Sequence, residues 1–226
     1  ESPSGRRGDP QRVEIEGGTF AMGTSGDVAY PEDGETLVHQ VTVEPFRIDA
    51  HAVSNARFAE FIDATGYVTD GERYDWSFVF GGLLPDDFEE TRGVANAPWW
   101  RQVFGANWRK PEGPHSTIDD RADHPVIQVS HGDALAFCEW DGSRLPTEAE
   151  WAWAMRYEGN PQATSFSWGD RLPPSEGSGN FADQSPAELV PTVIPGYDDG
   201  YASTAPVGTF RANALGVYDR AGNVAE

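Results

Sequence analysis

The sequence is poor in basic residues, in cysteine and in long apolar runs. Its 226 residues include 16 Lys and Arg against 37 Asp and Glu, a net charge of −21 at pH 7, and Lys110 is the only lysine. Because proteins bind nucleic-acid phosphates through clusters of Lys and Arg, this balance argues against nucleic acid as a partner and against anionic membrane surfaces. No stretch approaches the ~18 consecutive apolar residues of a membrane-spanning helix.

Further absences remove several classes of enzyme. Cys138 is the only cysteine, so no internal disulfide forms, and the compartment stays open: the cytoplasm is expected for a bacterial or archaeal source, with secretion as the alternative. The sequence has no Gly-x-Ser-x-Gly elbow, no Gly-x-Gly-x-x-Gly fingerprint and no phosphate-binding loop. No two histidines have the spacing of a helical metal site, so zinc and non-haem iron are not expected.

The residues that are present predict few regular elements. The run VEIEGGTFAMG at 13–23 predicts two strands joined at Gly17-Gly18 as a hairpin. Val41–Val43 and Phe46–Ile48 predict a second strand pair, interrupted by the proline between them.

Three helices carry clear capping signals. A helix is predicted over Ser54–Ala64, where serine is the N-cap and a glycine follows the last turn. A second runs over Ser130–Trp140, with Cys138 on its inward face, and a third begins at the Thr-x-x-Glu box of Thr147 and Glu150 and ends at Gly159.

The rest of the chain is predicted to be irregular. Residues 67–129 and 160–213 are rich in Gly, Pro, Asp and Trp and show no sustained period of a helix or strand. The eight tryptophans indicate packed loops rather than disorder. Trp99-Trp100 and Trp108 would either fill a core or stack on a ligand.

Two isolated side chains are weighed as catalytic candidates. Cys138 next to Phe137 favours a buried, inert thiol over a disulfide with another chain or a catalytic thiol. His131 favours a surface or packing role over a base, because no orienting partner is visible.

Oxygen-rich clusters are the strongest chemical signal. They are GNFAD at 179–183, YDDGY at 197–201 and YDRAGNVAE at 218–226. Irregular loops of this composition supply the 6–8 oxygen ligands that calcium takes, although such runs also form ordinary turns.

A series of longer motifs carries a family resemblance. GGTFAMG, APWW, GANWRKPEGP, HPVIQVS, RLPTEAEWAWA and NALGVYDRAGNVAE follow in this order. The sequence resembles the sulfatase-modifying factor family, the formylglycine-generating enzymes and their paralogues. The resemblance implies an α+β, C-type-lectin-like fold with little regular secondary structure and long packed loops. It implies one domain over 13–226 that lacks its C-terminal part. Residues 1–12 are rich in Pro, Gly and charge and are expected to form a flexible lead-in.

The resemblance also implies a reaction. Enzymes of the family oxidise the cysteine of a Cys-x-Pro-x-Arg segment in an unfolded sulfatase to Cα-formylglycine, with oxygen and a copper(I) ion held by two cysteines. Those cysteines lie beyond the GNV-x-E motif, so no catalytic residue is assigned here. Copper(I) is expected only where the pair is present, and the isolated chain is expected to be inactive. A second chain that completes the fold is one expected partner.

Calcium ligands are carried over residue by residue. One implied structural calcium site comprises Asn180, the Phe181 carbonyl, Asp199 and the Tyr201 carbonyl. The other comprises Asp219, the carbonyls of Gly222 and Val224, and Glu226.

Two departures from the family pattern support an alternative. His131 and Ala225 stand where the enzymes carry tryptophan and an aromatic residue. They favour a non-catalytic paralogue that uses the lectin-like scaffold to bind a peptide or a surface ligand. An iron-dependent sulfoxide synthase is disfavoured, because its run of iron-binding histidines is missing.

Overall fold

The computed structural model describes residues 12–25, 30–156, 166, 168–184, 193–219 and 221–225. All but the last residue of the predicted lead-in, and the predicted helix end at Gly159, lie outside these ranges. No helix within them is both long and apolar enough to span a membrane. The elements in chain order are β1 Arg12–Ile15, β2 Gly18–Met22, η1 Pro31–Asp33, β3 His39–Val43, β4 Phe46–Asp49, α1 Asn55–Thr65, α2 Asp70–Tyr74, β5 Trp76–Phe80, η2 Gly81–Leu83, β6 Gly93–Val94, β7 Ala97–Phe104, α3 His131–Asp141 and α4 Glu148–Arg156.

The first four strands form a bent antiparallel ribbon. β1 pairs with β4 and β2 pairs with β3, so the predicted strands are present, but the predicted hairpin of β1 with β2 and the predicted pairing of β3 with β4 are wrong. Gly17 is a bend and not a turn: a Cβ there would lie 2.4 Å from the Val43 carbonyl oxygen, so only glycine permits this close approach. Pro45 interrupts the opposite side, because it offers no N–H to the ladder.

The three predicted helices are confirmed, and their caps explain their ends. Ser54 accepts the Arg57 N–H at the start of α1, and Gly66 closes the helix with a φ of 67°. α3 and α4 begin in capping boxes, Ser130–Asp133 and Thr147–Glu150 respectively. These signals are local, so they are readable from sequence.

The main core lies between α1 and α3. Trp108 is fully buried and stands edge-on to Phe58, with 5.2 Å between ring centroids. This confirms the prediction that the loops are packed. Cys138 is buried in the same cluster, and burial raises the pKa of its thiol, as expected of an inert side chain.

The segment 67–129 is more regular than predicted. It contains α2 and a three-stranded antiparallel sheet in the order β5-β7-β6. Val79 and Val103 face the core, whereas Phe78, Trp100 and Phe104 are 44, 44 and 62% exposed. Because both faces of the sheet are apolar, the sequence lacks the alternation of apolar and polar residues that marks a half-buried strand.

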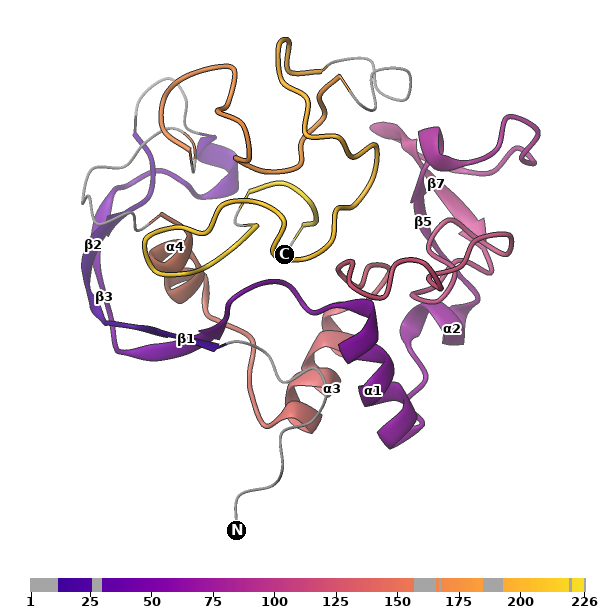
Figure 1. Cartoon of the computed structure of the whole chain (residues 1–226), viewed down its shortest axis with the longest axis horizontal. Helices are drawn as coiled ribbons and strands as arrows, with labels where there is room; N and C mark the ends of the chain where they lie inside the picture. Colours follow the sequence, from indigo (N-terminus) through magenta and orange to yellow (C-terminus); the bar gives the residue numbers. More distant parts are fainter. Residues whose placement is uncertain are drawn as a thin grey trace.

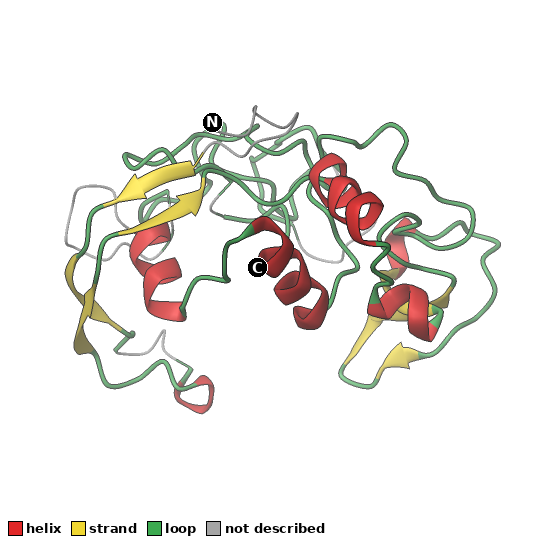
Figure 2. Cartoon of the chain, turned by 90° about the horizontal axis from the view of Figure 1, so that it is seen from below, coloured by secondary structure: helices red, strands yellow, loops and turns green. Residues whose placement is uncertain are grey.

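The elements are arranged around a centre of loops. In Figure 1, the β1–β4 ribbon lies at the left, β5 and β7 at the right, and α1 and α3 between them. Figure 2 places the strands at the two sides of the molecule with helices and loops between. The segments after α4, orange to yellow in Figure 1, contain no helix or strand among their described residues. They hold the candidate metal ligands.

Candidate metal centre

Three loops that follow α4 in the sequence lie close together in space. Asn180 forms a parallel bridge with Gly222, and the Asn223 N–H donates to the Asn180 carbonyl oxygen at 2.9 Å. The structure therefore brings the two implied ligand sets side by side. Glu226 lies outside the described residues.

Asp199 organises the first set. Its Oδ2 accepts the Phe181 N–H and its Oδ1 accepts the Tyr201 N–H, both at 2.9 Å. The Asn180 side-chain amide donates to the Ser203 carbonyl. Asp199 thus holds the backbones of Phe181 and Tyr201, and Asn180 is bonded to the same loop two residues beyond Tyr201.

Asp183 is a member of this group that the ligand assignment missed. Its side chain is fully buried and accepts the backbone N–H of Asp199. Burial raises the pKa of Asp199, and the charge of Asp183 raises it further. The signal was present in the sequence, since Asp183 ends the GNFAD run.

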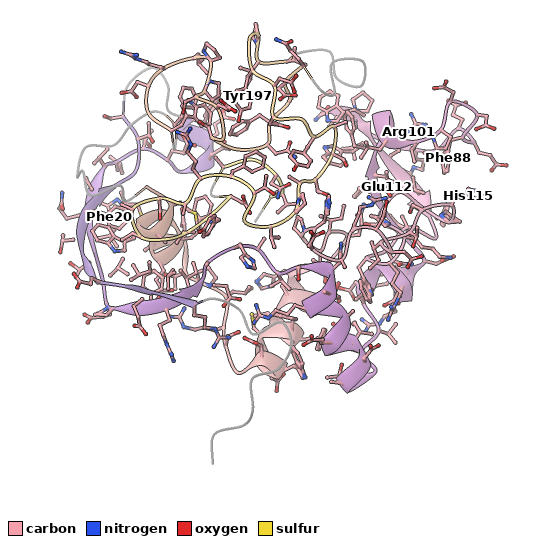
Figure 3. The ribbon with its side chains drawn as sticks, viewed as in Figure 1. Phe20, Phe88, Arg101, Glu112, His115 and Tyr197 are labelled. Atoms are coloured by element: carbon pink, nitrogen blue, oxygen red, sulfur yellow. The ribbon has the colours of Figure 1, made fainter. Side chains whose placement is uncertain are left out.

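The chemistry of the donor set fits calcium. The described members offer two carboxylates, one side-chain amide and backbone carbonyls, which are all oxygen donors of the kind Ca²⁺ takes. Tyr197, labelled in Figure 3, lies beside them: its hydroxyl donates to the Gly179 carbonyl at 2.7 Å. A cation here would offset the negative charge of the buried Asp183 and the partly buried Asp199.

The second set has a less complete donor group. The Asp219 carboxylate accepts the N–H groups of Phe210, at 3.0 Å, and of Gly208. Gly222 has a φ of 70°, and a Cβ there would lie 1.8 Å from the Asn180 carbonyl oxygen, so glycine is required. Asp219 is the only carboxylate of this set within the described residues.

The described residues offer few other candidate catalytic or metal-binding groups. Among the described residues, no three His, Cys, Asp or Glu side chains come together as a metal cluster. His131 is exposed in the first turn of α3, which fits the surface role that was favoured. Trp99, 50% exposed, lies outside the core that Trp108 fills.

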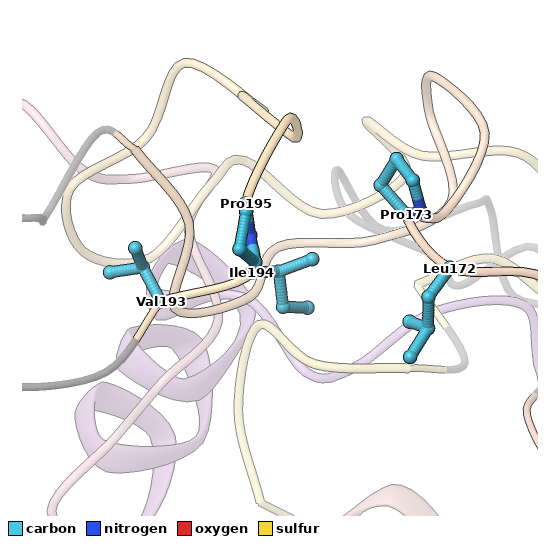
Figure 4. Close-up of a pocket in the computed structure, with 5 residues that line it drawn as sticks. All are labelled: Leu172, Pro173, Val193, Ile194 and Pro195. Atoms are coloured by element: carbon cyan, nitrogen blue, oxygen red, sulfur yellow. The ribbon is translucent and has the colours of Figure 1, made fainter.

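A shallow hollow lies near these loops. It encloses about 360 Å³ and is drawn in Figure 4. Its lining is entirely apolar, so it offers no acid, base or nucleophile: Leu172, Pro173, Val193, Ile194 and Pro195.

Comparison with known proteins gives the family. Residues 2–226 match the model of the sulfatase-modifying factor enzyme 1-like domain. The chain belongs to the sulfatase-modifying factor family. A formylglycine-generating enzyme from Thermomonospora curvata is 47% identical over 218 residues, which cover 95% of this chain and 69% of that relative. An inactive Cα-formylglycine-generating enzyme 2 from Bos taurus is 39% identical over 220 residues, 95% of this chain and 68% of that relative.

Solved structures support the same fold. PvdO from Pseudomonas aeruginosa has a TM-score of 0.58 at 24% identity, covering 93% of this chain and 67% of PvdO. Together with small sheets and long packed loops, this shows the α+β sulfatase-modifying-factor fold. The family includes active and inactive members, so membership alone does not assign an activity.

Proposed function

We propose that this chain is part of a formylglycine-generating oxidase that acts on a sulfatase cysteine. The observation that carries the proposal is the 47% identity to a formylglycine-generating enzyme over 95% of the chain. The substrate would be an unfolded sulfatase segment with the sequence Cys-x-Pro-x-Arg. Its extended backbone and single thiol would be recognised before the sulfatase folds.

The cysteine content does not fit copper(I) chemistry within these 226 residues. A copper(I) site of this family takes two thiolates, and the only cysteine is buried in α3 with its thiol pKa raised. No catalytic step is therefore assigned to a side chain of this chain. Its proposed contribution is the scaffold.

An activity assay tests whether these 226 residues need the family segment that carries the cysteine pair. The chain is incubated with copper(I), oxygen and a Cys-x-Pro-x-Arg peptide, and the peptide is followed by mass spectrometry. We expect no conversion above a control without protein. The same chain extended by the family segment that carries the cysteine pair is expected to convert the peptide, whereas a serine version of the peptide stays unchanged.

A second candidate is a non-catalytic paralogue that binds a peptide or surface ligand. It is favoured by His131, which lies exposed at a position where the family resemblance implies a tryptophan. An extended protein that folds but fails to convert the peptide would support this candidate over the oxidase. Conversion by the 226 residues alone would contradict the proposed scaffold role.

We further propose that the loops after α4 hold structural calcium. The first site would use Asn180, Asp199 and the carbonyls of Phe181 and Tyr201, with Asp183 as an additional negative charge. The second would use Asp219, Gly222, Val224 and Glu226. The support is that backbone N–H groups of Phe181 and Tyr201 donate to the Asp199 carboxylate and the Asp199 N–H donates to Asp183, which brings these oxygen-rich segments together.

Removal of calcium is expected to lower the melting temperature. An ion that binds only the folded state adds RT ln(1 + [L]/Kd), about 2.7 kcal/mol at a hundredfold excess over Kd. Asp199→Asn should remove most of the response to chelator, because it deletes the negative charge and one of the two carboxylate oxygens while changing the size of the side chain little. Asp198→Asn is the matched control, since Asp198 is the exposed neighbour. Equal chelator responses in both variants would contradict the first site.

A further inference from the structure

We propose that the two cation sites are coupled, so that an ion in one raises the affinity of the other. This inference rests on the proposed calcium binding. It concerns how the sites communicate, which neither the donor chemistry nor the family match addresses. The coupling element is a pair of asparagines, Asn180 and Asn223.

Asn180 is an implied ligand of the first site, and its backbone is bonded to the loop of the second site. Its side chain is in the first implied ligand set, and it is only 9% exposed. Its backbone forms the bridge to Gly222 and accepts the Asn223 N–H at 2.9 Å. Gly222 and Val224 are implied ligands of the second site, and Asn223, whose N–H donates to the Asn180 carbonyl, lies between them in the sequence. Because only glycine permits the close approach at position 222, the two loops lie in direct contact there.

Asn223 extends the connection to the third loop. Its Oδ1 accepts the Ala205 N–H at 2.8 Å, and its Nδ2 donates to the Ala205 carbonyl at 3.2 Å. Ala205 is fully buried and follows Ser203, whose carbonyl accepts the Asn180 side-chain amide. The loop that carries Asp199 is therefore held by the same two asparagines.

Shared ordering is the physical basis of the coupling. The three loops contain no helix or strand in their described residues, so hydrogen bonds, the packing of buried residues such as Tyr197 and any bound ion together fix their order. The first ion bears the entropic cost of fixing all three loops, and the second binds loops already fixed. Linkage then requires the effect to be reciprocal. Direct contact between the ions is not needed.

Calorimetric titration of the 226-residue chain with Ca²⁺ tests the proposal. We expect two ions to bind with a Hill coefficient above one. Asp219→Asn removes a ligand of the second site only, yet it should weaken calcium at the first site by at least about 5-fold, the lower range of allosteric coupling. Asp199→Asn should weaken the second site by the same factor.

A substitution of Asn223, which joins the loops but is not an implied ligand, separates the loss of coupling from the loss of a ligand. Asn223→Gly deletes the clamp on Ala205 and tolerates the φ of 61° at this position. Both sites should still bind in this variant, with a Hill coefficient near one. Asp75→Gly is the matched control, because Asp75 also has a positive φ, 58°, but caps α2 far along the chain. It should leave the titration curve unchanged.

The outcomes distinguish the two proposals. If Ca²⁺ produces no binding heat, calcium binding itself is wrong. If two ions bind independently and Asn223→Gly changes nothing, calcium binding is supported and the coupling is overturned. The same conclusion follows if only one ion binds. Should Asn223→Gly fail to fold by circular dichroism, reciprocity between Asp199→Asn and Asp219→Asn decides.

Discussion

Replacing Trp108 by alanine is expected to lower the free energy of unfolding by about 3–5 kcal/mol, the usual cost of emptying a buried tryptophan site. Trp108 is fully buried in the cluster between α1 and α3. Its ring contacts Phe58 edge-on, and the Arg109 guanidinium lies 4.1 Å from its centroid. The variant loses apolar burial, ring contacts and a cation–π pair together.

A second substitution makes this prediction sharper. The indole Nε1–H of Trp108 is buried and makes no hydrogen bond with any described residue. Trp108→Phe removes that unpaired donor and leaves a smaller cavity, so its cost should be well below that of alanine. Trp99→Ala is the control, because Trp99 is 50% exposed and its loss should cost less than about 1 kcal/mol. Equilibrium unfolding in urea measures all three.

Similar losses in Trp108→Ala and Trp99→Ala would contradict the assigned core. A Trp108→Phe variant as unstable as Trp108→Ala would show that the indole N–H has a partner. The three variants thus test both the packing of Trp108 in the core and the absence of a hydrogen-bond partner for its indole N–H among the described residues.

The helices could be predicted from sequence because their determinants are local. Ser54, Ser130 and Thr147 each precede an apolar face and bond to the N–H three residues later. Such contacts do not depend on the remainder of the chain. The helix positions therefore agree with prediction to within one or two residues at the described ends.

Strand pairing could not be predicted, because it is decided by distant residues. Gly17 reads as a turn residue locally, but Val43 and Pro45 lie against it and make it a bend. β5 and β7 were missed because the outward face carries Phe78 and Trp100 in place of polar residues. Register information of this kind is absent from a local pattern.

The candidate site was predictable in composition but not in geometry. The family motifs named Asn180, Asp199 and Tyr201, and the structure bonds Tyr201 to Asp199 and Asn180 to Ser203 in the same loop. Asp183 could have been suspected from its run, yet only the fold shows that it is buried against Asp199. The bridge from Asn180 to the last loop spans about forty residues and has no local signature.

A four-residue ion network joins the ribbon to the helices. Arg57, 6% exposed, donates to Asp49 and, at 2.6 Å, to Asp141, and it lies 5.0 Å from the Phe137 ring centroid. Arg12 bonds to the same two carboxylates. β1, β4, α1 and α3 are thereby linked through charged groups, of which Arg57 and Asp141 are largely removed from water and Arg12 is exposed. In this environment each charge depends on its partners.

Asp141→Ala is expected to cost about 3 kcal/mol, the lower end of the range for breaking a buried pair, because Asp49 still accepts from Arg57. Asp120→Ala is the matched control. Asp120 faces Arg121 at 3.7 Å, but its side chain is 83% exposed, so its loss should cost less than about 1 kcal/mol.

The cost of Asp141→Ala should also depend on pH, with a sign that the structure fixes. Burial acts to raise the pKa of Asp141, but hydrogen bonds from Arg57 and Ser143 outweigh it and lower the pKa below its ordinary value. A group with a lowered folded-state pKa contributes stability above its unfolded pKa, and this contribution is lost as pH falls through the folded value. The difference between wild type and Asp141→Ala should therefore be full near neutral pH and shrink in acid. Urea unfolding across this pH range measures it, and a difference that stays constant, or grows in acid, would mean that the carboxylate does not bear the network's charge.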